Sequence, residues 1–120
     1  MSLYLPEEFR ITTSSFHGRS FTLIIRDKKL TYHATRPDER LIRDPAENDW
    51  NIFWKKTIDL KIWIWSKSYV DHGNSDGQNW SVKLGFGKLK LQTYGSSDHP
   101  ENFKEFLEAV RVLIGGIELY

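Results

Sequence analysis

The chain has 120 residues, of which 39% are hydrophobic and 28% are charged, a composition typical of a water-soluble globular protein and a length that fits one domain, residues 1–120. Its formal net charge is +1, so no field of the whole molecule favours nucleic acid or an anionic membrane. It has no cysteine, which excludes a disulfide framework, a thiolate nucleophile and cysteine-ligated zinc.

The N-terminal stretch, MSLYLPEEF, lacks the basic and apolar regions of a secretory signal. No apolar run approaches the ~20 residues that span a bilayer. We therefore expect a cytoplasmic protein without a membrane anchor.

The first predicted element is a strand over residues 9–16, FRITTSSF. Its register stays open at this point, because a two-residue turn after it would bury Phe16 and expose Ile11, whereas a three-residue turn would reverse them.

Two segments, 21–34 and 80–93, alternate apolar and polar side chains on either side of a short turn, which is typical of β-hairpins. In each hairpin the apolar residues share one face of the two strands. The apolar pairs expected to face each other beside the turns are Ile25 with Leu30 around Asp27 and Lys28, and Leu84 with Leu89 across Phe86 and Gly87.

Each hairpin is followed by a predicted amphipathic helix, over residues 44–57 and 100–114. The first has Asp44 as its expected N-cap and Pro45 at its first helical position, after a polar surface crossover; the second opens at Pro100 and stops at a pair of glycines. The expected buried stripes are Ala46, Trp50, Phe53, Trp54 and Thr57 in the first helix, and Phe103, Phe106, Leu107, Val110, Leu113 and Ile114 in the second.

Residues 60–69, LKIWIWSKSY, alternate isoleucine with tryptophan and predict a strand before the second hairpin. The chain then follows the order strand, strand, strand, helix twice, which suggests a duplicated βββα unit with halves at 9–57 and 60–114. This order predicts an α+β fold with a single antiparallel sheet of about six strands and both helices on one face.

The parity of the strands assigns an aromatic surface to the sheet face that no helix covers. The isoleucines of residues 60–69 point to the helices by this reasoning, and the tryptophans point away from them. Two tryptophans and two tyrosines are more than a wet sheet face needs. The candidate binding residues are Trp63, Trp65, Tyr69, His33, Tyr94 and Lys90.

We expect a non-enzymatic protein that uses this face to bind a partner protein or a second copy of itself, unless its own termini cover the face. The alternative is a small-ligand site in which aromatic planes stack a sugar, a nucleotide base or an organic cation. The near-neutral charge and the lack of an RNA-recognition motif argue against nucleic acid. An immunity or antitoxin protein is a further hypothesis that no particular residue supports.

No residue pattern predicts catalysis or a cofactor. The loop DHGNSDG, residues 71–77, fails the spacing of a calcium loop and is interpreted as a turn, with a weak metal or ligand site as the alternative. The histidines lack metal-ligand spacing, and neither a nucleophile motif nor a pair of acid and base carboxylates is evident.

The pattern formed by DGQNW at 76–80, Gly95 and HPENFKEFLEAVRVLI at 99–114 resembles one found in small uncharacterised bacterial proteins. In that pattern DGxxW precedes a strand pair, a glycine and a terminal helix opened by PxxFxxFL. Such proteins are similar to those carried on mobile elements such as integron gene cassettes. The resemblance implies a fold of the βββα kind and no catalytic residues.

Overall fold

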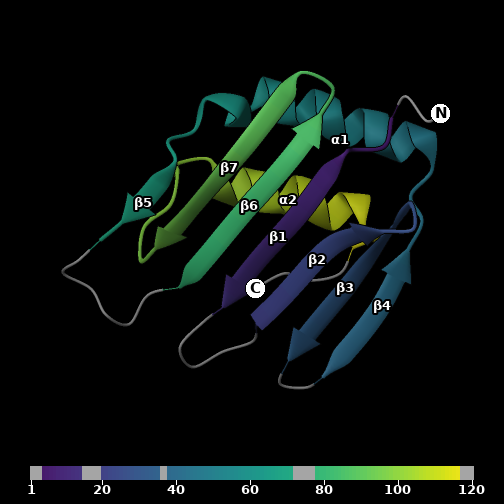
Figure 1. Cartoon of the computed structure of the whole chain (residues 1–120), viewed down its shortest axis with the longest axis horizontal. Coiled ribbons are helices and arrows are strands. Elements are labelled where there is room, and N and C mark those ends of the chain that lie inside the picture. The colour runs from purple at the N-terminus through teal and green to yellow at the C-terminus, as the bar shows by residue number, and fades with distance from the viewer. Residues whose placement is uncertain (1–3, 15–19, 36–37, 72–77, 117–120) are drawn as a thin grey trace.

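A mixed sheet of seven strands forms one layer, and two helices lie on one of its faces (Figure 1). This computed structural model describes residues 4–14, 20–35, 38–71 and 78–116. The predicted α+β class and the single sheet are confirmed. The prediction of a purely antiparallel sheet is wrong, because β5 runs parallel to β7.

The sheet has the strand order β4-β3-β2-β1-β6-β7-β5, so β1 is central and the last two strands of the N-terminal half form one edge. Helix α1 connects β4 at one edge to β5 at the other and therefore crosses the sheet (Figure 1). The strands are β1 (Glu8–Ser14), β2 (Ser20–Arg26), β3 (Lys29–Thr35), β4 (Glu39–Arg43), β5 (Ser68–Val70), β6 (Asn79–Phe86) and β7 (Leu89–Ser96). The helices are α1 (Glu47–Asp59), the short 3₁₀ helix η1 (Ile62–Ile64) and α2 (Phe103–Leu113).

The β2–β3 hairpin has the predicted register, with Ile25 opposite Leu30. Its two turn residues, Asp27 and Lys28, have φ angles of 52° and 67°. Positive φ at both positions is the geometry of a type I′ turn, whose twist matches that of the flanking strands.

The β6–β7 hairpin is shifted by two residues from the prediction. Leu84 faces Leu91 instead of Leu89, because Phe86 continues the pairing and Gly87 starts the turn with a φ of 61°. A shift by an even number of residues leaves every side chain on its predicted face.

The open question of the β1 register is resolved in favour of Ile11. This side chain is fully buried and pairs with Leu23, so the two-residue turn that would have exposed it is wrong. Phe16 lies outside the described residues.

The predicted crossover before α1 contains an additional edge strand, β4, which pairs with β3 and places Leu41 opposite Tyr32. Its sequence, ERLIR, contains three charged residues. Charged side chains on an edge strand discourage pairing with another chain.

Helix α2 buries its predicted stripe, and α1 buries Trp50, Phe53, Trp54 and Thr57, but the predicted stripe residue Ala46 is exposed at the N-cap. The predicted N-cap at Asp44 is wrong: α1 begins at Glu47 after Ala46, and the carboxylate of Asp49 accepts a hydrogen bond from the Ala46 amide at 3.1 Å. None of the described helices is both long and apolar enough to cross a membrane.

The predicted strand over residues 60–69 is wrong for most of its length. Helix α1 continues to Asp59, Lys61 reverses the chain with a φ of 58°, and η1 follows. In a 3₁₀ turn the side chains at i and i+3 point the same way, so Ile62 and Trp65 face the protein together. Ile64 is 80% exposed, which contradicts its predicted place in the core.

Replacing Trp54 with alanine should lower the free energy of unfolding by about 3–5 kcal/mol, because a large side chain would be lost from the core. Trp54 is buried, stacks on Phe86 at 4.3 Å and donates its indole N–H to the Tyr4 carbonyl at 2.7 Å. Denaturant titration measures the loss. Ile64→Ala is the control, expected to change stability by no more than about 0.5 kcal/mol; a similar small change for Trp54→Ala would contradict its place in the core.

Candidate functional site

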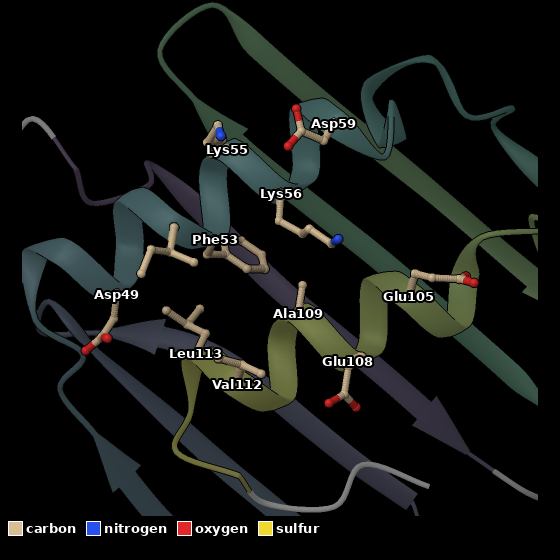
Figure 2. A pocket seen from close by; sticks show the side chains of 11 residues that line it. Asp49, Phe53, Lys55, Lys56, Asp59, Glu105, Glu108, Ala109, Val112 and Leu113 are labelled. Atoms are coloured by element: carbon tan, nitrogen blue, oxygen red, sulfur yellow. The ribbon is translucent and has the colours of Figure 1, made fainter.

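A groove lies between α1 and α2, on the side of the helices away from the sheet (Figure 2). Its volume is about 530 Å³. The apolar part of its lining is formed by Ile52, Phe53, Ala109, Val112 and Leu113. We call this surface the helical groove.

Two apolar side chains of the helical groove are left in contact with water. Ile52 on α1 is 55% exposed and Val112 on α2 is 59% exposed. Each lies two residues away from a buried member of its helix stripe, Trp50 and Val110 respectively. A concave apolar surface of this kind is the usual form of a binding site.

The α1 wall of the helical groove carries charges of both signs, and the α2 wall is acidic. Lys55 and Lys56 line it on α1, and Glu105 and Glu108 line it on α2 (Figure 2). Asp49 and Asp59 add carboxylates on the α1 side. The groove is therefore mostly basic in the middle of one wall and acidic along the other.

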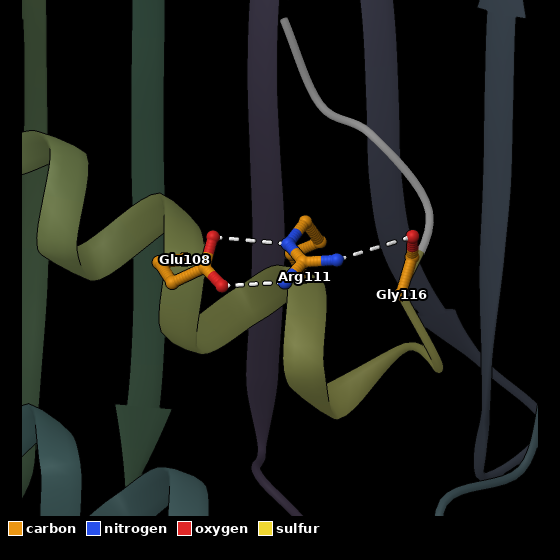
Figure 3. A network of polar contacts seen from close by, with 3 residues as sticks. All are labelled: Glu108, Arg111 and Gly116. Carbon is orange, nitrogen blue, oxygen red and sulfur yellow. Dashed lines mark hydrogen bonds and ion pairs between the residues drawn. The ribbon is translucent and has the colours of Figure 1, made fainter.

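Glu108 is held by Arg111, one turn further along α2. The guanidinium donates two hydrogen bonds to the carboxylate, at 2.6 Å and 2.9 Å, and a third to the Gly116 carbonyl at 3.4 Å (Figure 3). This bonding holds the pKa of Glu108 below its ordinary value. Among the described residues, Glu105 forms no ion pair, unlike Glu108.

The predicted tryptophan site is the main correction to the sequence analysis. Trp63 and Trp65 do not lie on the uncovered sheet face; they are half-buried against the core on the helix side. Trp63 donates its indole N–H to the Thr57 hydroxyl at 3.2 Å, and Trp65 donates to the Asn102 side-chain oxygen at 3.0 Å. Asn102 also donates to the Leu60 carbonyl, which ties the turn after α1 to the start of α2.

The predicted strand parity also placed Tyr69 on the wrong face of the sheet. Its ring lies 5.9 Å from that of Trp80, on the helix side, and its hydroxyl accepts a hydrogen bond from the Ser66 amide at 2.9 Å. Among the predicted aromatic binding residues, Tyr94 alone lies on the uncovered face, where it is 55% exposed.

His33 also lies on the uncovered face, and its Nε2 is 2.7 Å from a carboxylate oxygen of Asp38. His33 is on β3 and Tyr94 is on β7, four strand spacings apart, or about 19 Å at the usual spacing of strands. The two residues therefore cannot contact one small ligand together.

Three of the predicted binding residues do meet, at the β7 edge of the sheet. Trp63, Trp65 and Lys90 line a cavity of about 450 Å³ that also contains Lys67 and Lys83. We call it the edge cavity. It joins tryptophans from the helix side to lysines from the uncovered face.

The uncovered face is polar rather than aromatic. One row across its middle strands consists of His33, Thr22, Thr12, Ser81 and Tyr94. The hydroxyls of Thr12 and Ser81 lie 2.6 Å apart. Such a face is suited to water and does not require an apolar partner.

Among the described residues, no cluster of three or more histidine, aspartate or glutamate side chains is arranged to hold a metal ion. The candidate loop 71–77 falls outside the described residues except for Asp71.

The residues of the C-terminal pattern form an aromatic cluster. Trp80 packs on Phe103 at 4.6 Å and donates its indole N–H to the Asp98 carbonyl at 2.8 Å. A side chain at Gly95 would overlap the Trp80 indole and come within 2.5 Å of the Asp98 carbonyl oxygen. The pattern from Trp80 to Phe103 therefore has a structural explanation. Asp76 and Gly77 lie outside the described residues.

Comparison with family models, with curated proteins and with solved structures gives no match for this chain.

The sequence analysis did not predict the helical groove, because the groove depends on how two helices pack side by side. The periodicity of each helix predicts only which face of that helix is buried. A signal was nevertheless present. Ile52 and Val112 are apolar residues outside the buried stripes of their helices, and two such residues on one layer indicate an exposed apolar surface.

Gly95→Ala should lower the free energy of unfolding by about 1–3 kcal/mol, because the added methyl group overpacks the site against Trp80. Denaturant titration followed by tryptophan fluorescence measures it. Gly85→Ala on the neighbouring strand is the control, since its methyl group would meet chiefly the mobile end of Lys90, at 3.1 Å. Equal effects of the two substitutions would show that the Trp80 contact is not the cause.

Proposed function

We propose that this chain is a non-enzymatic interaction protein that pairs with a second copy of itself through the helical groove. The observation that supports this most directly is the exposure of Ile52 and Val112, at 55% and 59%, beside the buried floor of Phe53 and Leu113. No catalytic or cofactor chemistry is part of the proposal.

Water contact at these side chains is unfavourable. Full burial of an isoleucine or valine contributes roughly 1.5–3 kcal/mol relative to full exposure. In a dimer with two-fold symmetry each contact occurs twice, so modest gains at Ile52 and Val112 are doubled. The groove brings Ile52 and Val112 together on one concave surface.

Charge complementarity favours a second copy as the occupant. Rotating one copy by 180° about an axis along the groove places α1 of one molecule opposite α2 of the other. Lys56 then faces Glu105 of the second copy, because both lie toward the same end of the groove (Figure 2). The two Lys56–Glu105 contacts are related by the two-fold axis and lie on either side of it, at the same end of the groove.

The uncovered sheet face offers less to a protein partner. Its central row consists of threonine and serine hydroxyl groups together with His33 and Tyr94. The two tryptophans that were predicted to make this face apolar, Trp63 and Trp65, pack against the core instead. Interface cores are enriched in aromatic residues and depleted in charge. The helical groove has an apolar floor of Phe53, Ala109 and Leu113 within a charged rim, whereas the row across the uncovered face has no such floor.

Ile52→Ser combined with Val112→Ser should raise the dimer dissociation constant at least about tenfold, a loss of about 1.4 kcal/mol, because apolar contacts are removed on both sides of the two-fold axis. Sedimentation equilibrium measures it. Ile58→Ser is a matched control: the same residue type on the same helix, 57% exposed, outside the groove. A wild-type chain that stays monomeric at high concentration would contradict the proposal and favour a different protein as occupant.

Charge reversal tests the orientation of the two copies. Lys56→Glu and Glu105→Lys should each weaken the homodimer, because like charges then face each other twice. A mixture of the two variants should recover dimers, all of them mixed, because only that pairing places opposite charges at both contacts. Isotope labelling of one variant and native mass spectrometry identify the species. Failure of the mixture to recover would reject the proposed pairing of α1 with α2.

A further inference from the structure

The edge cavity forms where the β7 edge is left partly uncovered. Strand β5 pairs only with the Tyr94–Ser96 end of β7. Alongside the remainder of β7, the turn after α1 brings Trp63 and Trp65 close to the sheet. The resulting cavity of about 450 Å³ is large enough for a small organic molecule.

The charge of the edge cavity is positive. Lys67, Lys83 and Lys90 line it, against a single carboxylate, Glu8. Glu8 lies 3.8 Å from Lys83. Lys67 and Lys90 form no ion pair with any residue in the described ranges. Two ammonium groups are therefore available for an anion.

Lys90 is guided across the sheet by the absence of a side chain at Gly85, its partner on β6. A Cβ atom at Gly85 would lie 3.1 Å from the Lys90 ammonium nitrogen. The lysine side chain therefore folds across the neighbouring strand, over Gly85, instead of extending into water, and its ammonium group lines the cavity.

The two indole rings are fixed before any ligand arrives. Their N–H groups are turned into the protein, toward Thr57 and Asn102, and the ring of Trp65 also packs edge-on against Phe106 at 5.4 Å. With the N–H groups already satisfied, the rings present carbon surface to the cavity. Rigid aromatic surface of this kind favours stacking of a flat ring at low entropic cost.

We infer that the edge cavity binds a small anion that carries a flat ring, with the ring against Trp63 and Trp65 and the carboxylate or phosphate between Lys67 and Lys90. The excess of ammonium groups disfavours the organic cation that an aromatic site alone would also accept. This site is separate from the helical groove and does not depend on dimer formation.

Titration of the ¹⁵N-labelled protein tests the site through the indole N–H signals of its five tryptophans, assigned by Trp→Phe variants. The probes are naphthalene-2-carboxylate and its neutral carboxamide, adenosine monophosphate and adenosine, and inorganic phosphate. At least one ring-bearing anion should shift the signals of Trp63 and Trp65 and leave that of Trp50 unchanged. That anion should bind about tenfold more tightly than its neutral partner and than phosphate.

The two anionic probes distinguish a carboxylate site from a phosphate site, and either result supports the inference. Equal affinity for an anion and its neutral partner would overturn the role of the lysines. If inorganic phosphate bound as tightly as the ring-bearing anion, the role of the rings would be overturned. No shift at Trp63 and Trp65 with any probe would overturn the site.

Lysine substitutions supply the second test. Lys67→Gln and Lys90→Gln should each weaken binding of the anion about two- to fivefold, and should leave the neutral partner unaffected. Lys104→Gln on α2, an exposed lysine outside the cavity, is the matched control. The dimer dissociation constant should be the same in all three variants, so failure of this inference is distinguishable from failure of the proposed dimer. If the variant that combines Lys67→Gln with Lys90→Gln bound the anion as tightly as the wild type, the assignment of these two lysines to the anion site would be rejected.

Discussion

The packing of aromatic rings between the sheet and the two helices is the interaction on which the rest of this structure depends. All five tryptophans lie in this layer or at its margin, with Trp50, Trp54 and Trp80 buried. Helix α1 contributes two of these rings, and Trp80 lies across Gly95, where no side chain would fit. Because the rings face inward, the opposite side of the sheet is free to be polar.

This arrangement changes where binding is expected. A sheet face rich in tryptophan would itself require a cover, but the observed face carries hydroxyl groups and charged side chains that water satisfies. On the outer side of the helices, Ile52 and Val112 expose apolar surface to water. The remaining tryptophan surface, at Trp63 and Trp65, is combined with lysines in a cavity suited to a small molecule.

The sequence predicted the parts of the fold that local pattern determines. Alternation placed Ile25 opposite Leu30, and the helical stripes of α1 and α2 were read correctly, because each depends on neighbours along the chain. The segment around Trp63 failed because alternating isoleucine and tryptophan fits a strand as well as a 3₁₀ turn. The reversal at Lys61 and the Asn102 hydrogen bonds that fix that turn depend on contacts distant in sequence. The shape of the helical groove also depends on such contacts, although Ile52 and Val112 gave a signal of exposed apolar surface, whereas three residues of the edge cavity were predicted as binding residues: Trp63, Trp65 and Lys90.

The central claim is that two copies meet through their helices and leave their sheet faces apart. Because the chain has no cysteine, a single nitroxide label can be attached at Lys104→Cys on α2 or at Thr22→Cys on the uncovered face. Distances between labels in the dimer, measured by double electron–electron resonance, should be short for position 104. They should exceed about twice the molecular thickness of 19 Å for position 22. A short distance at position 22 with a long one at position 104 would place the contact on the sheet and contradict the account.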